Sequence, residues 1–178
     1  MGGCTHAEGY DTLAYNGGHA EGAGSKAIGE HSHAEGHYTQ AGKYKTNEQN
    51  KLVDKDGNIV DDELYADTVG DYTHAEGRYT QAIAEAAHAE GISTTASGNY
   101  SHAEGSHAVA SGKVSHAEGS HTKAIGDYSH AEGDNTKSNG EFSHAEGKDT
   151  ITIGFYSHAE GNGTKAYSNA SHAEGYKT

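Results

Sequence analysis

SHAEGSHAVASGKVSHAEG, residues 101–119, contains the pentapeptide Ser-His-Ala-Glu-Gly twice, with the two copies fourteen residues apart. Across the 178-residue chain, the histidine of His-Ala-Glu-Gly recurs at steps of 14, apart from one step of 13 and one of 41. The step of 41 equals one period of 14 and 27 additional residues. The sequence therefore predicts one continuous repeat domain, formed by residues 1–41 and 69–178, with an inserted hairpin or loop at 42–68.

Each period consists of two similar halves, Ser-His-Ala-Glu-Gly and Thr-x-Ala-x-Gly, each followed by two variable residues. Small residues at alternate positions, with Gly in every half, contradict both helix propensity and the apolar seam of a coiled coil. This alternation is typical of a short strand followed by a tight turn. We therefore predict an all-β fold, a parallel β-roll (solenoid) of 14-residue coils that stack roughly 4.8 Å apart into a rod about 55 Å long.

The phase of the alternation predicts which side chains lie inside the roll. Because side chains alternate across a strand, Ser101, Ala103 and Gly105 face one way and His102 and Glu104 the other. A coil this narrow has room inside only for small side chains, so the small set points inward. A row of Thr shares the phase of these alanines and is also expected inside: Thr80, Thr94, Thr122, Thr136, Thr150 and Thr164.

The two outward faces differ in how much they vary between copies. The outward residues of the second half differ from coil to coil: Lys26 and Ile28 in one coil correspond to Val109 and Ser111 in another. Such variation is typical of a surface that faces water. The outward residues of the first half are His and Glu in all eleven copies. We expect this face to meet something that repeats at the same interval, and another copy of the chain does so. The predicted interface ladder comprises His6, Glu8, His19, Glu21, His33, Glu35, His74, Glu76, His88, Glu90, His102, Glu104, His116, Glu118, His130, Glu132, His144, Glu146, His158, Glu160, His172 and Glu174.

The chemistry of the ladder favours pairing of His with Glu. Glu carboxylates stacked roughly 5 Å apart repel one another, and burying them unpaired costs several kcal/mol each. A His beside each Glu can donate a hydrogen bond, and such pairing is expected to raise the His pKa and to lower the Glu pKa. Two alternatives stay open: a solvated ladder on a monomer, which stabilises little, and a metal-binding ladder for zinc, nickel or iron. Because His–Glu hydrogen bonding accounts for the same residues, we predict no metal and no cofactor.

Composition and charge narrow the function classes. Of the 26 acidic residues, 11 are the Glu of the repeat, and they account for most of the formal charge of −14. Without clustered Lys or Arg, the chain offers no electrostatic footprint for a nucleic-acid partner. The single cysteine, Cys4, excludes an internal disulfide, and no apolar run predicts membrane insertion. Eleven equivalent His-Glu pairs also argue against an enzyme, since an active site is a single place with unequal environments, so no catalytic residue is predicted.

Aromatic residues recur at the turn position that precedes the Ser or Thr of a coil. We expect these side chains to stack along one edge of the roll and to cover turns or pack between subunits, with sugar binding as the alternative. They are Tyr72, Tyr100, Tyr128, Phe142 and Tyr156.

The insertion carries a local hairpin signal. Within residues 51–60, two short apolar pieces flank an Asp-Gly turn. A hairpin that protrudes from a rigid rod is expected to be a variable contact surface.

The half-repeats Ser-Lys-Ala-Ile-Gly at 25–29 and Thr-Lys-Ala-Ile-Gly at 122–126 resemble the head domains of trimeric autotransporter adhesins, whose repeat centres on Ser-Val-Ala-Ile-Gly. The resemblance covers nearly the whole chain outside the insertion. It implies a left-handed parallel β-roll assembled side by side as a homotrimer. In the Ser-His-Ala-Glu-Gly half, His and Glu replace the Val and Ile of the family, so the resemblance implies a polar seam in place of an apolar one.

The His-Ala-Glu-Gly version more closely resembles repeats in tail-fibre and tail-spike proteins of phages and prophages of Gram-positive bacteria. This resemblance implies a structural rod or head segment of a trimeric tail fibre or receptor-binding protein, located in the virion, that attaches to the bacterial surface. The alternative is the head of a cell-surface adhesin. A bacterial cell-surface glycan or protein is the candidate ligand in both cases. The start of the chain, which leads into the repeat without an export signal, favours the virion.

Overall fold

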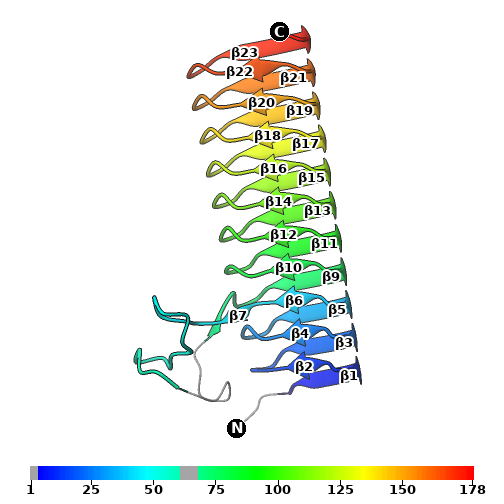
Figure 1. The fold of residues 1–178 in the computed structure, drawn as a ribbon, viewed down its shortest axis with the longest axis vertical. Coiled ribbons are helices and arrows are strands. Elements are labelled where there is room, and N and C mark those ends of the chain that lie inside the picture. The colour runs from blue at the N-terminus through cyan, green and yellow to red at the C-terminus, as the bar shows by residue number, and fades with distance from the viewer. Residues whose placement is uncertain (1–3, 61–67) are drawn as a thin grey trace.

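The computed structural model of the chain describes residues 4–60 and 68–178. Within them the chain winds into stacked coils, with the N-terminus at one end of the stack and the C-terminus at the other (Figure 1). The described residues contain strands and turns and no helix. The predicted all-β parallel solenoid is therefore confirmed.

Two parallel sheets run the length of the stack. The first contains eleven strands of five residues: β1 (His6–Tyr10), β3 (His19–Ala23), β5 (His33–His37), β9 (His74–Arg78), β11 (His88–Ile92), β13 (His102–Ser106), β15 (His116–Ser120), β17 (His130–Asp134), β19 (His144–Lys148), β21 (His158–Asn162) and β23 (His172–Tyr176). The second contains ten strands of two residues: β2 (Leu13–Ala14), β4 (Lys26–Ala27), β6 (Gln40–Ala41), β10 (Gln81–Ala82), β12 (Thr95–Ala96), β14 (Val109–Ala110), β16 (Lys123–Ala124), β18 (Lys137–Ser138), β20 (Ile151–Thr152) and β22 (Lys165–Ala166).

Every coil stacks on the next in the register of the repeat. His102 pairs with His116, and Glu104 pairs with Glu118, so identical residues stack along the sheet. The register continues across the insertion, because β5 pairs directly with β9 and β6 with β10. The roll is thus one continuous element on both sides of residues 42–68.

The core of the roll consists of small side chains only. The buried alanines of both sheets are at most 2% exposed, and the largest fully buried side chains are Thr and Ser. The Thr row predicted to lie inside is fully buried. The inward phase of Ala, Ser and Thr is therefore confirmed, and with it the outward phase of His and Glu.

The Gly of His-Ala-Glu-Gly is required by the close approach of neighbouring coils. Gly105 has a φ of +107°, a backbone conformation that residues other than glycine rarely adopt. A Cβ built on Gly105 would also collide with the carbonyl oxygen of Gly119 in the next coil. The same contact recurs between successive copies. This glycine therefore sets how closely the coils stack.

The insertion projects from one side of the roll near its N-terminal end (Figure 1). At its base, β7 (Lys43–Tyr44) pairs antiparallel with β8 (Thr68–Val69). Further out, Val53 and Ile59 form an antiparallel bridge around a turn in which the Asp54 carboxylate accepts backbone N–H groups. The remainder of the predicted insertion, residues 61–67, lies outside the described residues.

Ile28, which is predicted to face water, is buried instead. Ile28 is buried, at 3% exposed, whereas Ile125 at the equivalent position is 46% exposed. Ile28 lies on the coil next to the point where the chain leaves the roll at Gly42 and returns at Gly70. We attribute its burial to the insertion, which leaves the roll there.

A glycine-to-alanine pair tests the packing of the coils. We expect Gly119→Ala to destabilise the roll by at least about 3 kcal/mol, because the added Cβ meets backbone at an unfavourable φ. Gly57→Ala is the matched control: its φ is also positive, but nothing lies within 4 Å, so a loss of about 1 kcal/mol is expected. Urea unfolding followed by circular dichroism measures both, and equal losses would contradict the close-approach argument.

Candidate functional site

The His and Glu of the repeat form one ladder on the outer face of the eleven-stranded sheet. They occupy the first and third positions of each long strand, on either side of an Ala that is buried in every long strand except the terminal β1 and β23. The imidazoles stack in an unbroken column in which neighbouring ring centroids are 4.6–4.9 Å apart. The column crosses the insertion, since the rings of His33 and His74 are 4.7 Å apart and nearly parallel. The structure therefore places all 22 predicted ladder residues on one face.

In an isolated chain this face is half-exposed. In mid-roll the side chain of His102 is 37% exposed and that of Glu104 is 48% exposed. A second body lying against the sheet would therefore cover imidazole and carboxylate together.

The His–Glu contacts within a coil are looser than predicted. The separation between His Nε2 and Glu Oε2 ranges from 3.4 to 3.9 Å where an ion pair is formed. Within the described ladder, His6 with Glu8 and His33 with Glu35 form a hydrogen bond, both at 3.4 Å, whereas His74 and Glu76 have the same separation without forming one. The prediction of a hydrogen bond at each Glu is therefore wrong for the chain on its own, because the rings stack on one another instead of turning toward the carboxylates.

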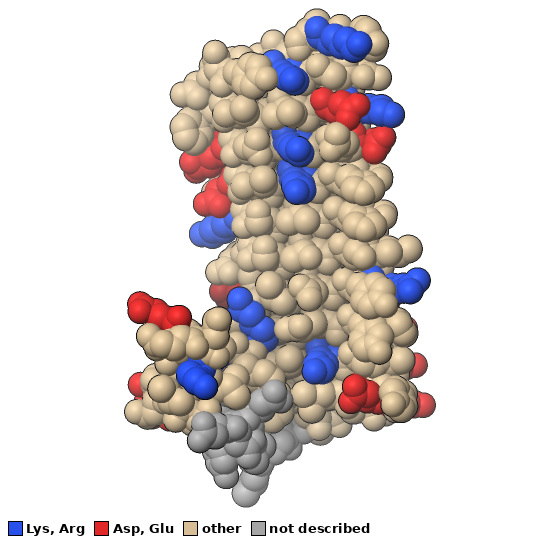
Figure 2. All heavy atoms as spheres, viewed as in Figure 1, with Lys and Arg blue, Asp and Glu red and all other residues tan. Residues whose placement is uncertain are grey.

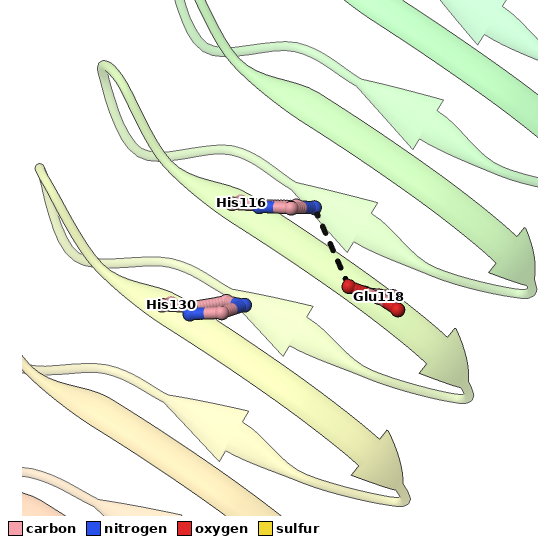
Figure 3. Close-up of side chains that lie close together, drawn as sticks. All are labelled: His116, Glu118 and His130. Atoms are coloured by element: carbon pink, nitrogen blue, oxygen red, sulfur yellow. Dashed lines mark ion pairs between the residues drawn. The ribbon is translucent and has the colours of Figure 1, made fainter.

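The stacking leaves imidazole nitrogens without partners. The Nε2 atoms of seven ladder histidines are enclosed by their neighbours and make no hydrogen bond. Figure 3 shows the arrangement for two of them, with the rings of His116 and His130 side by side and the Glu118 carboxylate beyond their edges. A buried polar atom in this condition costs about 1–3 kcal/mol. The seven are His74, His88, His102, His116, His130, His144 and His158.

Burial lowers the pKa of the central imidazoles. For His88, His102, His130 and His144, partial burial disfavours the charged form, and the stacked His of adjacent coils lower the pKa further. Neighbouring Glu carboxylates act in the opposite direction but contribute less. The predicted rise of the His pKa is therefore wrong for these four in the single chain, because partial burial and the neighbouring imidazoles outweigh the carboxylates. They do not offset the charge of the carboxylates at pH 7.

Three overlapping sets in the ladder bring together the ligand types of a metal site. In each, two His of adjacent strands and the Glu between them offer ligand atoms that lie within 4.8 Å of one another. The sets are His116, Glu118 and His130; His130, Glu132 and His144; and His144, Glu146 and His158.

The predicted aromatic row is continuous over only part of its length. Tyr128, Phe142 and Tyr156 stack with centroids 4.8 and 5.1 Å apart, and all three are exposed. Tyr72 stacks on His31 instead. The Tyr100 hydroxyl donates a hydrogen bond to Glu85 at 3.0 Å, which raises the pKa of Tyr100. Stacking along one edge is thus confirmed for three of the five aromatics.

Residues 89–115 match the YadA head domain repeat in two copies. No curated protein is significantly similar to the chain. Together with the solenoid fold, the match supports the resemblance to the heads of trimeric autotransporter adhesins. None of the described residues form a helix long and apolar enough to span a bilayer.

The lowered His pKa values predict that acid destabilises the roll. Between the lowered folded pKa and the ordinary value of 6.5, the unfolded chain binds protons that the folded chain does not, so stability falls as pH falls through this window. We expect a lower melting temperature at pH 5.5 than at pH 7.5, measured by circular dichroism with a chelator present.

Replacement of two ladder imidazoles should reduce this dependence. In the His130→Gln, His144→Gln double variant the difference in melting temperature between the two pH values should be smaller. In the control, His107→Gln with His121→Gln, which removes an exposed stacked pair outside the ladder, the difference should stay as in the unmodified chain. A melting temperature independent of pH in the unmodified chain would contradict the assignment.

Proposed function

We propose, from the resemblance to trimeric autotransporter heads, that the chain is a structural rod or head segment that holds a recognition surface away from its anchor. Two continuous parallel sheets, stacked in register from end to end, support a rigid spacer. The match to the YadA head domain repeat supports an adhesin-like role.

The rod is a homotrimer whose chains lie side by side through the His-Glu face. This face carries the longer strands and the same two outward residues in every coil, whereas the outward residues of the short strands differ. The core of a single roll contains no fully buried side chain larger than Thr, so lateral association provides burial that one roll lacks. The face in Figure 2 shows Lys and Arg along its middle and small separate groups of Asp and Glu toward its edges, without a continuous column of acidic side chains.

The rod belongs to a phage tail fibre or receptor-binding protein, in the virion, that attaches to the bacterial surface. The His-Ala-Glu-Gly form of the repeat favours this assignment over a cell-surface adhesin head. The adhesin remains the second candidate, and the YadA match favours it.

The inserted hairpin is the contact surface of the rod, and its ligand is a bacterial cell-surface glycan or protein. An open recess of about 430 Å³ lies where the insertion joins the roll, and Lys43, Val69, Asp71, Ile83 and Glu85 contribute to its lining. Charged and apolar groups side by side suit a ligand that carries both polar and apolar parts.

The oligomeric state tests the proposal most directly. Size-exclusion chromatography with light scattering should give three times the chain mass of 18.5 kDa at micromolar concentration. Glu118→Arg with Glu132→Arg places two bulky cations in the proposed seam and should shift the species toward the monomer. Lys123→Glu with Lys137→Glu, on the opposite sheet, should leave the mass unchanged. A stable monomer of the unmodified chain, or equal effects of the two double variants, would refute the seam.

We also propose that the chain is not an enzyme. The ladder offers the same acid–base pair in every coil, with no single member set apart from the rest. Incubation of the purified chain with bacterial cell-wall glycans should therefore release no soluble fragments above the buffer control. Release that persists after repeated purification would show a catalytic site.

A further inference from the structure

The ladder segment from β15 to β21, called here the upper ladder, groups the ligand types of a metal site, which a rigid spacer does not need. It consists of His116, Glu118, His130, Glu132, His144, Glu146 and His158. In this segment each Glu and two His of adjacent strands offer ligand atoms that lie within 4.8 Å of one another. Among residues 4–60 and 68–178, such sets occur only here.

The imidazole nitrogens of this segment lack partners in a place that solvent does not reach. Nε2 of each of the four His is enclosed and makes no hydrogen bond. The carboxylate is too far away to serve: Nε2 of His116 lies 3.9 Å from Oε2 of Glu118, which is beyond hydrogen-bond range. An ion between the two groups would contact both (Figure 3).

The donor set defines the class of ion. Two neutral imidazoles and one carboxylate are ligands that zinc and its neighbours in the transition series accept, and this set leaves a fourth position for water or another group.

We propose that the upper ladder binds divalent transition-metal ions of the zinc type, each held by two His and one Glu of a single chain. Bond lengths near 2.0–2.1 Å in a tetrahedral site place ligand atoms about 3.3 Å apart, so the side chains must close by at most roughly 1.5 Å. Rotation about side-chain bonds suffices, since these side chains are part-exposed and the backbone register already places them on adjacent strands.

Shared ligands fix the number of ions. His130 belongs to the first and second sets, and His144 to the second and third, so the second set competes with both of its neighbours. The first and third sets share no residue and can be filled together. Each chain therefore binds two ions, not one for every coil.

This inference goes beyond the proposed rod function. All three ligands of each ion come from one chain, so the sites need no second chain, although the proposed trimer seam covers the same face. Metal binding and chain mass are measured separately, and the failure of one proposal leaves the other standing.

Calorimetric titration of zinc chloride into the full chain tests the proposal. The chain is purified without a metal-affinity column and stripped with a chelator that is then removed. We expect two ions per chain, and cobalt as a second probe should give the intense visible bands of a tetrahedral nitrogen–oxygen site. Binding only at millimolar zinc, or a stoichiometry close to one ion per coil, would overturn the proposal.

Variants make the test specific. His130→Gln removes the first two sets and should leave one ion, and His130→Gln with His144→Gln removes all three sets and should leave none. The control His107→Gln with His121→Gln should still bind two, because this exposed stacked pair lies outside the ladder. Circular dichroism confirms the fold of each variant before titration. Retention of two ions by the ladder double variant would refute the assignment.

Discussion

The narrow interior of the roll is the constraint on which the rest of the structure depends. Each coil encloses only Ala, Ser, Thr and Gly, and the repeat glycine approaches the carbonyl of the next coil so closely that no side chain fits there. A shift of register would place His or Glu in a space that holds a methyl group. The coils therefore stack in one register, one strand spacing apart.

This register decides the electrostatics of the surface. When identical coils stack, every outward side chain has copies of itself as its nearest neighbours above and below. An imidazole column results, with rings 4.6–4.9 Å apart, and the rings depress one another's pKa. The same geometry places an oxygen of each upper-ladder Glu within 4.8 Å of ring nitrogens of two His on adjacent strands, where a cation or a partner surface can satisfy groups that the single chain leaves unpaired.

Much of the fold could be predicted from the sequence, because period and phase are both explicit in it. The 14-residue step and the alternation of small residues led to the parallel coils, the buried Ala and Thr and the outward His and Glu. Three features were beyond this reasoning. The burial of Ile28 depends on a segment inserted after the next coil. The direction of the His pKa depends on partial burial, to which the stacked His add, rather than on the nearest Glu. The grouping of the upper-ladder ligands depends on side-chain rotation within a register that all coils share.

The direct pairing of β5 with β9, and of β6 with β10, means that the chain leaves the roll and returns without a gap in either sheet. A side branch at this turn therefore does not interrupt the hydrogen bonding of either sheet. Its length and chemistry can be exchanged while the register and length of the roll stay constant.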